Sequence, residues 1–157
     1  MTFEQAKRKE TEAVVAYSRH KAAEGCDYSG YVGSRVQMSR LDGLLYFRGG
    51  LAFGIEIKWR RFDLCTLMTQ HNGEMLMPAD KLLAGQALAY AFGVPTLLLY
   101  LLDDYLLAQK VVAGNGDKVN VSREIYEQSN KTIEGGTIQR KNCYIKVEGA
   151  EKIPLGL

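Results

Sequence analysis

Cysteine and histidine are scarce in this sequence. The 157 residues include three cysteines, Cys26, Cys65 and Cys143, and two histidines, His20 and His71. An odd number of widely spaced cysteines argues against a disulfide framework, and neither CxxC pairs nor clustered histidines offer zinc ligands. We therefore expect a protein of a reducing compartment that holds no structural zinc.

Long apolar runs and a strong charge of either sign are also missing. The most apolar run, residues 94–102, is too short to span a bilayer, and no signal peptide opens the chain. The net charge of +2 does not by itself indicate a nucleic-acid binder. Motifs for nicotinamide cofactors, Walker-type phosphate loops and nucleophilic Ser or Cys catalysis are absent from the sequence. We expect a cytoplasmic protein, prokaryotic or phage-encoded, with no membrane partner.

What remains is the composition of a globular domain, with 46% apolar and 24% charged residues. The length suffices to bury a sizeable core. No internal repeat, low-complexity tract or linker divides the chain. We expect one domain over residues 1–157, with its core over residues 3–112 and a C-terminal elaboration over residues 113–157.

Local signals predict two helices. Thr2 and Gln5 fit a capping box for a helix over residues 3–24, which Gly25 would end. A second helix is expected over residues 79–92, ended by Gly93.

Strands are expected between and after these helices. Residues 94–102 and 105–113 predict a buried strand and its partner across a turn. A hairpin is predicted over residues 40–60, a short strand near 35–39 and one further strand at 142–149, whereas residues 62–78 are ambiguous. The order predicts an α/β domain around a central mixed sheet.

The predicted hairpin, RLDGLLYFRGGLAFGIEIKWR, has a two-residue alternation. Odd positions in both arms are apolar or glycine, so paired residue numbers must sum to an even value. A three-residue loop at residues 48–50 gives this register, whereas a two-residue turn needs a bulge, for instance at Gly54. In that register Asp42 lies directly across from Glu56, with Cβ atoms about 5 Å apart.

Opposed carboxylates repel, so something should hold Asp42 and Glu56 together. Magnesium is the natural candidate, because hard cations bind one or two carboxylates together with water and phosphate oxygens. Lys58 shares the face of Glu56 and is placed to orient water or stabilise phosphate charge. The alternative is that Glu56, Lys58 and Arg60 form the solvated face of a half-buried strand, with Glu56 and Lys58 in a weak surface pair.

An acid at the start of one strand, a hairpin and then Glu-x-Lys resembles the PD-(D/E)xK nuclease superfamily, which has the restriction-endonuclease-like fold. Here the elements are Asp42, thirteen intervening residues and EIK at 56–58, and the resemblance covers about residues 3–105. It implies an α-β-β-β-α-β order with helices flanking the mixed sheet. Leu41 stands where the motif has proline.

The resemblance implies a role for each motif residue. Asp42, Glu56 and the backbone carbonyl of Ile57 would hold Mg²⁺, for which Mn²⁺ substitutes, and Lys58 would assist the attacking water. Glu10 lies in the apolar stripe of the first predicted helix, where Holliday-junction resolvases carry a glutamate near the metal. The alternative for Glu10 is that it reaches solvent at the edge of the stripe.

Further side chains are candidates for supporting roles. Gln86 and Tyr90 resemble the Gln-x-x-x-Tyr element of RecB-type exonucleases, which positions the substrate strand or the lysine. The alternative is a glutamine that satisfies a neighbouring loop, with Tyr90 in the core. Arg60 and Arg61 could follow a phosphate backbone, although such runs are usually solvated faces, and Trp59 is predicted to be core.

The resemblance therefore implies a metal-dependent nuclease that hydrolyses phosphodiester bonds in DNA. Without a separate recognition domain, structure- or end-directed cutting in repair, recombination or phage DNA processing is favoured over sequence-specific cutting. Because resolvases and many restriction enzymes are dimers, a homodimer is also allowed, with the polar C-terminal portion as interface. The alternatives are a catalytically inactive nucleic-acid-binding module and an RNA-directed nuclease.

Overall fold

Helices form where the capping signals predict them in the computed structural model, which describes residues 2–33, 41–130 and 136–156. Helix α1 (Phe3–Ala23) begins with the expected capping box, in which Thr2 and Gln5 exchange hydrogen bonds. Helix α3 (Ala79–Phe92) ends at Gly93, whose φ of +70° suits glycine. Both predictions are confirmed.

A third helix was not predicted. Helix α2 (Leu64–Gln70) lies in the segment that the sequence left ambiguous, and the Asp63 side chain caps it by accepting the Thr66 N–H. No helix in the described part of the chain is long and apolar enough to cross a membrane.

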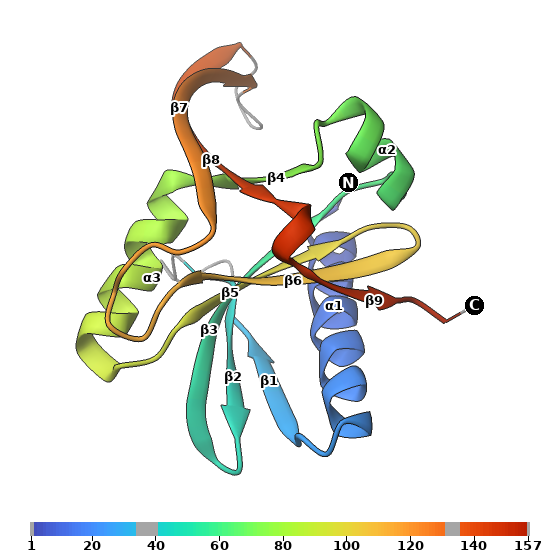
Figure 1. The fold of residues 1–157 in the computed structure, drawn as a ribbon, viewed down its shortest axis with the longest axis vertical. Coiled ribbons are helices and arrows are strands. Elements are labelled where there is room, and N and C mark those ends of the chain that lie inside the picture. The colour runs from blue at the N-terminus through green and yellow to red at the C-terminus, as the bar shows by residue number, and fades with distance from the viewer. Residues whose placement is uncertain (1, 34–40, 131–135, 157) are drawn as a thin grey trace.

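A mixed six-stranded sheet forms the centre of the fold (Figure 1). In sheet order its strands are β1 (Tyr28–Val32), β2 (Gly43–Phe47), β3 (Gly50–Trp59), β5 (Thr96–Leu101), β6 (Tyr105–Val112) and β9 (Glu151–Pro154). Strands β3 and β5 are parallel, and the other neighbours are antiparallel. The prediction of an α/β fold with a mixed sheet is confirmed. The strand expected near residues 35–39 lies outside the described residues.

The β2–β3 hairpin reaches the predicted register by a different turn. Phe47 pairs with Gly50, so the loop has two residues, Arg48 and Gly49, both with positive φ. The predicted three-residue loop is therefore wrong. A bulge then shifts the register, so that Leu45 pairs with Phe53 and the odd-numbered apolar sets share a face. The alternation thus sets the inner register, and an extra residue in β3 accommodates the tight turn.

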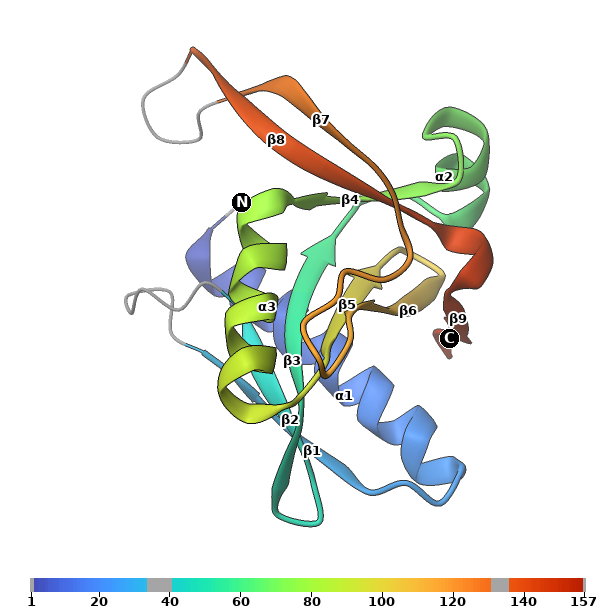
Figure 2. The same ribbon diagram turned by 60° about the vertical axis from the view of Figure 1, so that its left-hand side comes forward.

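Two hydrophobic cores lie on opposite faces of the sheet. Ile55 and Ile57 of β3 point into the core beneath α1, which also contains Val14 and Tyr17. The other face is covered by α3, so that β3 lies between the two helices (Figure 2). Side chains at even positions of β3 therefore face α3.

Helix α3 approaches β3 closely because small residues line the contact. A Cβ atom added at Gly54 of β3 would lie 2.6 Å from Leu88 Cδ2. A Cβ atom at Gly85 of α3 would lie 2.7 Å from Thr96 Oγ1. These distances are shorter than van der Waals contact, so larger residues at either position would push the helix away from the sheet.

A second, three-stranded sheet closes the α3 side of the molecule. It contains β4 (Glu74–Pro78), β8 (Thr137–Lys146) and β7 (Val121–Asn130), in that order across the sheet. The β7–β8 hairpin projects from the body of the molecule (Figures 1 and 2). Pro78 both ends β4 and is the N-cap of α3, so that strand and helix join without an intervening loop.

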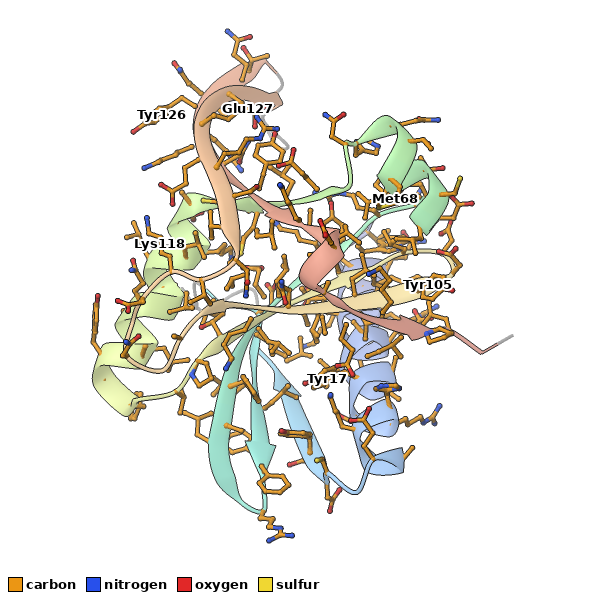
Figure 3. All side chains as sticks on the ribbon, in the orientation of Figure 1. Tyr17, Met68, Tyr105, Lys118, Tyr126 and Glu127 are labelled. Atoms are coloured by element: carbon orange, nitrogen blue, oxygen red, sulfur yellow. The ribbon has the colours of Figure 1, made fainter. Side chains whose placement is uncertain are left out.

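On the projecting hairpin, neighbouring side chains differ in environment. Tyr126 is 69% exposed, whereas Glu127 accepts hydrogen bonds from Tyr144 and Asn142 of β8. The two side chains point to different sides of the hairpin (Figure 3). Polar cross-strand contacts thus hold the hairpin together where it leaves the core.

The C-terminal portion contributes more than the elaboration expected from the sequence. Strand β9 completes an edge of the main sheet, and Cys143 and Ile145 of β8 are fully buried in the core beneath α3. The single strand expected at residues 142–149 is wrong in extent: β8 ends at Lys146 and a short 3₁₀ helix (Val147–Gly149) follows.

Truncating Ile153 should measure how much β9 contributes to the fold. Its side chain is 4% exposed, and its residue pairs with Leu106, which is fully buried. We expect Ile153→Ala to lower the free energy of unfolding by about 2–4 kcal/mol in urea denaturation. The exposed neighbour Lys152→Ala should cost less than about 1 kcal/mol. Equal costs for both variants would make β9 a peripheral strand.

Candidate functional site

Asp42 lies immediately before β2, and its backbone and side chain both bind β3. Its N–H donates to the Ile55 carbonyl at 3.0 Å, and its Oδ2 accepts the Ile57 N–H at 2.8 Å. The carboxylate thus takes the place of a main-chain acceptor just before the first residue of β2. Since Gly43 pairs with Ile55, Asp42 is opposite Glu56, as the sequence alternation predicts.

Glu56 is the most deeply buried charged residue of β3. Its side chain is 1% exposed, because β3 has strands on both sides and α3 above its even-numbered face. The alternative that Glu56 belongs to a solvated strand face is therefore contradicted. Buried carboxylates require a partner, a cation or a proton.

The environment of Glu56 opposes its ionisation. Burial raises the pKa of Glu56 well above its ordinary value, and the hydrogen bond and negative charge of Asp42 raise it further. The positive charges of Lys58 and Lys81 act in the opposite direction. When Glu56 is protonated it can donate to Asp42, and when it is ionised two negative charges face each other.

Lys58 lies two residues beyond Glu56 on the same face of β3 and is half-buried. Burial lowers the pKa of Lys58, and the positive charges of Arg60 and Lys81 also lower it, whereas Glu56 and Asp42 raise it. The ammonium group therefore loses its proton more readily than that of a solvated lysine. The sequence correctly placed Lys58 on the face of the acid pair.

Lys81 is a site residue that the sequence analysis missed. Its Nζ atom lies 3.4 Å from Glu56 Oε2, and its side chain is 22% exposed. Among the described residues, Glu56 Oε2 is buried and has no hydrogen-bond partner, so Lys81 contacts it as an ion pair only. One sequence signal was available, because Lys81 is the only cation in the otherwise mostly apolar helix α3.

Glu10 is buried on α1 with 5% exposure, so the alternative that it reaches solvent is contradicted. Its neighbour Lys9 places its Nζ 5.2 Å from the Trp59 ring centroid, which locates this part of α1 near the end of β3. In the described part of the chain, however, Glu10, Asp42 and Glu56 do not form a group of ligand atoms all within 4.8 Å. A direct metal contact by Glu10 therefore remains a prediction.

Among the described residues, a histidine and two glutamates that do meet this distance lie elsewhere. His20, Glu24 and Glu151 bring ligand atoms within 4.8 Å of one another. The Lys21 ammonium group lies 2.9 Å from Glu151 and 3.3 Å from Glu24, so a side-chain cation already neutralises these carboxylates. We interpret the cluster as an ion-pair network that ties β9 to α1.

Gln86 and Tyr90 both contact the loop around Gly116. Gln86 Nε2 donates to the Gly116 carbonyl at 2.9 Å. A Cβ atom added at Gly116 would overlap the Tyr90 ring, so the ring covers this glycine. The contact favours the alternative in which Gln86 satisfies a neighbouring loop. Tyr90 is not core, because it is 72% exposed, and its contact with substrate remains a prediction.

Two arginines follow the acid pair along β3. The Arg60 guanidinium lies 5.6 Å from the Tyr100 ring centroid and donates to the Trp59 carbonyl. Arg61 is exposed and lies 4.8 Å from the Trp59 ring centroid. Trp59 also packs against the core beneath α1, as predicted. Positive charge thus continues beyond Lys58 at this end of the strand.

Comparison with protein-family models, with curated proteins and with solved structures found no significant match. The functional argument therefore rests on the residues of this chain: two facing carboxyl groups, Asp42 and Glu56, and two lysines, Lys58 and Lys81.

Proposed function

We propose that the chain is a metal-dependent nuclease of the restriction-endonuclease-like fold that hydrolyses phosphodiester bonds in DNA. The observation that carries this proposal is the buried Glu56 carboxyl group, which faces Asp42 and has one oxygen without a hydrogen-bond partner among the described residues. Burying two facing carboxyl groups is costly even with the Lys81 ammonium 3.4 Å from Glu56 Oε2, so the arrangement is better explained by a ligand.

The donor set fits a divalent cation. Asp42 and Glu56 supply hard oxygen ligands, which Mg²⁺ and Mn²⁺ prefer, and the Ile57 carbonyl would complete the protein's share. The hydrogen bond from the Ile57 N–H fixes the Asp42 carboxylate before any cation arrives. When bound, the cation would activate water and polarise a phosphoryl oxygen.

The two lysines have different roles in this proposal. Lys58, whose pKa is lowered by burial, is placed to hold or accept a proton of the attacking water. Lys81 offsets part of the negative charge of Glu56 when that carboxyl group is ionised and, with Lys58, supplies positive charge toward a phosphate in the transition state. Both ammonium groups belong to the same face of the sheet.

The element order supports the proposed fold family. Helix α1, strands β1 to β3, helix α3 and strand β5 follow the α-β-β-β-α-β order that the resemblance implies. The acids lie at the β2–β3 pair and the Glu-x-Lys motif lies on β3, next to its parallel neighbour β5. Strand β4 and helix α2 are insertions in that order.

The purified chain should bind divalent cations and cut DNA. We expect calorimetric titration to detect Mn²⁺ and Mg²⁺ binding, and gel assays to show cleavage of linear, branched or single-stranded DNA that EDTA abolishes. Including RNA in every assay identifies the polymer. Salt-dependent DNA binding without cleavage under any metal condition would contradict the proposal and support an inactive binding module instead.

A further inference from the structure

A cavity of about 290 Å³ lies beyond the end of β3, between the main sheet and the second sheet, and charged and polar side chains share its lining with aromatic and aliphatic ones. Lys58 pairs laterally with Tyr100, and Tyr100 and Arg60 both line this cavity. The cavity therefore begins next to the lysine of the candidate site and on the same face of β3. We call it the Arg60 pocket; its other lining residues are Phe62, Gln70, His71, Asn72, Glu74, Leu76, Arg123 and Tyr144.

Arg123 is held firmly in the wall of the Arg60 pocket. Its Nη2 and Nε atoms lie 3.1 and 3.3 Å from the two carboxylate oxygens of Glu74, and its guanidinium stands 4.0 Å from the Tyr144 ring centroid. The Ser122 hydroxyl lies between two acceptors, 3.0 Å from Glu74 Oε2 and 2.8 Å from the Tyr144 carbonyl. Because Glu74 uses both oxygens in these contacts, it orients the guanidinium, whose remaining N–H groups stay available for another acceptor.

The rest of the lining is rich in hydrogen-bond donors. Arg60 uses one nitrogen for the Trp59 carbonyl, which leaves donors on its other nitrogens. His71 stacks on Phe62 with a centroid distance of 4.7 Å, and Gln70 and Asn72 flank it with side-chain amides. The lining thus contains two guanidinium groups against one carboxylate that is already occupied. This balance suits an anion with several acceptor oxygens.

We propose that the Arg60 pocket binds a phosphate group of the nucleic-acid strand that neighbours the phosphate being cleaved. Arg60 follows Lys58 by two residues, about 6.6 Å along a strand, which is comparable to the spacing of neighbouring phosphates. The volume also admits part of the attached sugar. This inference rests on the proposed nuclease function, and it adds Arg123 and His71 to the substrate contacts.

Salt dependence of DNA binding tests this proposal without requiring cleavage. Binding of a fluorescent oligonucleotide is measured by anisotropy in EDTA at several salt concentrations. We expect Arg60→Gln and Arg123→Gln each to weaken DNA binding. Each variant should also reduce by about one the steepness with which the logarithm of the association constant falls with the logarithm of the salt concentration, because each loses one phosphate contact. Arg123→Lys should retain the slope, since the charge remains. The exposed Lys110→Gln, on β6, should leave both quantities unchanged.

The outcomes separate this inference from the proposed function. If thermal melting confirms that both arginine variants fold and their slopes are unchanged, the proposed phosphate binding in the Arg60 pocket is wrong. The nuclease proposal would be unaffected. A slope change in Arg60→Gln alone would also overturn the proposed phosphate binding, because Arg60 would then act at an open surface. Reduced slopes in a protein that cuts no nucleic acid would support the pocket and contradict the nuclease.

Discussion

Replacing Lys58 with methionine is expected to reduce metal-dependent cleavage by at least about 100-fold, because a proton-transfer group and a positive charge near the phosphate are both removed. Methionine preserves most of the apolar stem of the half-buried side chain, so the fold should persist. Single-turnover cleavage with saturating enzyme measures the chemical step. Cation affinity, measured by calorimetry, should change by less than about tenfold, since Lys58 is not a proposed ligand.

The matched comparison is Asp42→Asn, which should lose both cleavage and cation binding. Asparagine retains an oxygen that can accept the Ile57 N–H, so the β2–β3 junction is preserved while the ligand charge is lost. Lys110→Met, in an exposed position on β6, should cleave like the unmodified protein. Normal cleavage by Lys58→Met would show that this lysine takes no part in the chemical step, regardless of the cation affinity of the variant.

Glu56→Gln is expected to stabilise the metal-free protein at neutral pH while abolishing cation binding. The folded-state pKa of Glu56 is raised by burial and then by Asp42, so between about pH 4.5 and that higher value the folded state binds more protons than the unfolded state. Stability must then fall as the pH rises through this window. Glutamine removes the ionisation, so we expect Glu56→Gln to have a larger free energy of unfolding than the unmodified protein at pH 8.

Urea denaturation at pH 5 and pH 8, without divalent cations, measures this effect. The unmodified protein should be less stable at pH 8 than Glu56→Gln, and the difference should shrink toward pH 5. Adding Mg²⁺ at pH 8 should stabilise the unmodified protein by about 2.7 kcal/mol at one hundred times its Kd, and Glu56→Gln hardly at all. If the free energy of unfolding depends on pH in the same way in both proteins, the ionisation of Glu56 does not lower the stability of the folded state.

The parts of the fold that sequence alone predicts are those set by local signals. The capping box at Thr2 and the C-cap at Gly93 fix the ends of two helices, and strict alternation along β3 places Asp42 opposite Glu56. The turn type was wrong because a bulge restores the same alternation. Register is therefore easier to predict than the loop that produces it.

The elements that sequence analysis missed depend on partners far away in the chain. Strand β4 is completed by β8, for instance by the pairing of Met77 with Cys143, and neither segment shows a clear two-residue alternation on its own. Lys81 reaches Glu56 only because Gly54 and Gly85 let α3 lie close to the sheet. Such a contact depends on a helix-to-sheet distance that no single segment encodes.

Pro78 connects the projecting β7–β8 hairpin directly to the helix that carries Lys81. Pro78 pairs with Asn142 of β8 and is also the residue from which α3 starts, three positions before Lys81. We therefore expect a displacement of β8 to move the first turn of α3, and with it the Lys81 ammonium group that lies 3.4 Å from Glu56. A ligand bound to the projecting β7–β8 hairpin would then be expected to change the strength of the ion pair between Lys81 and Glu56.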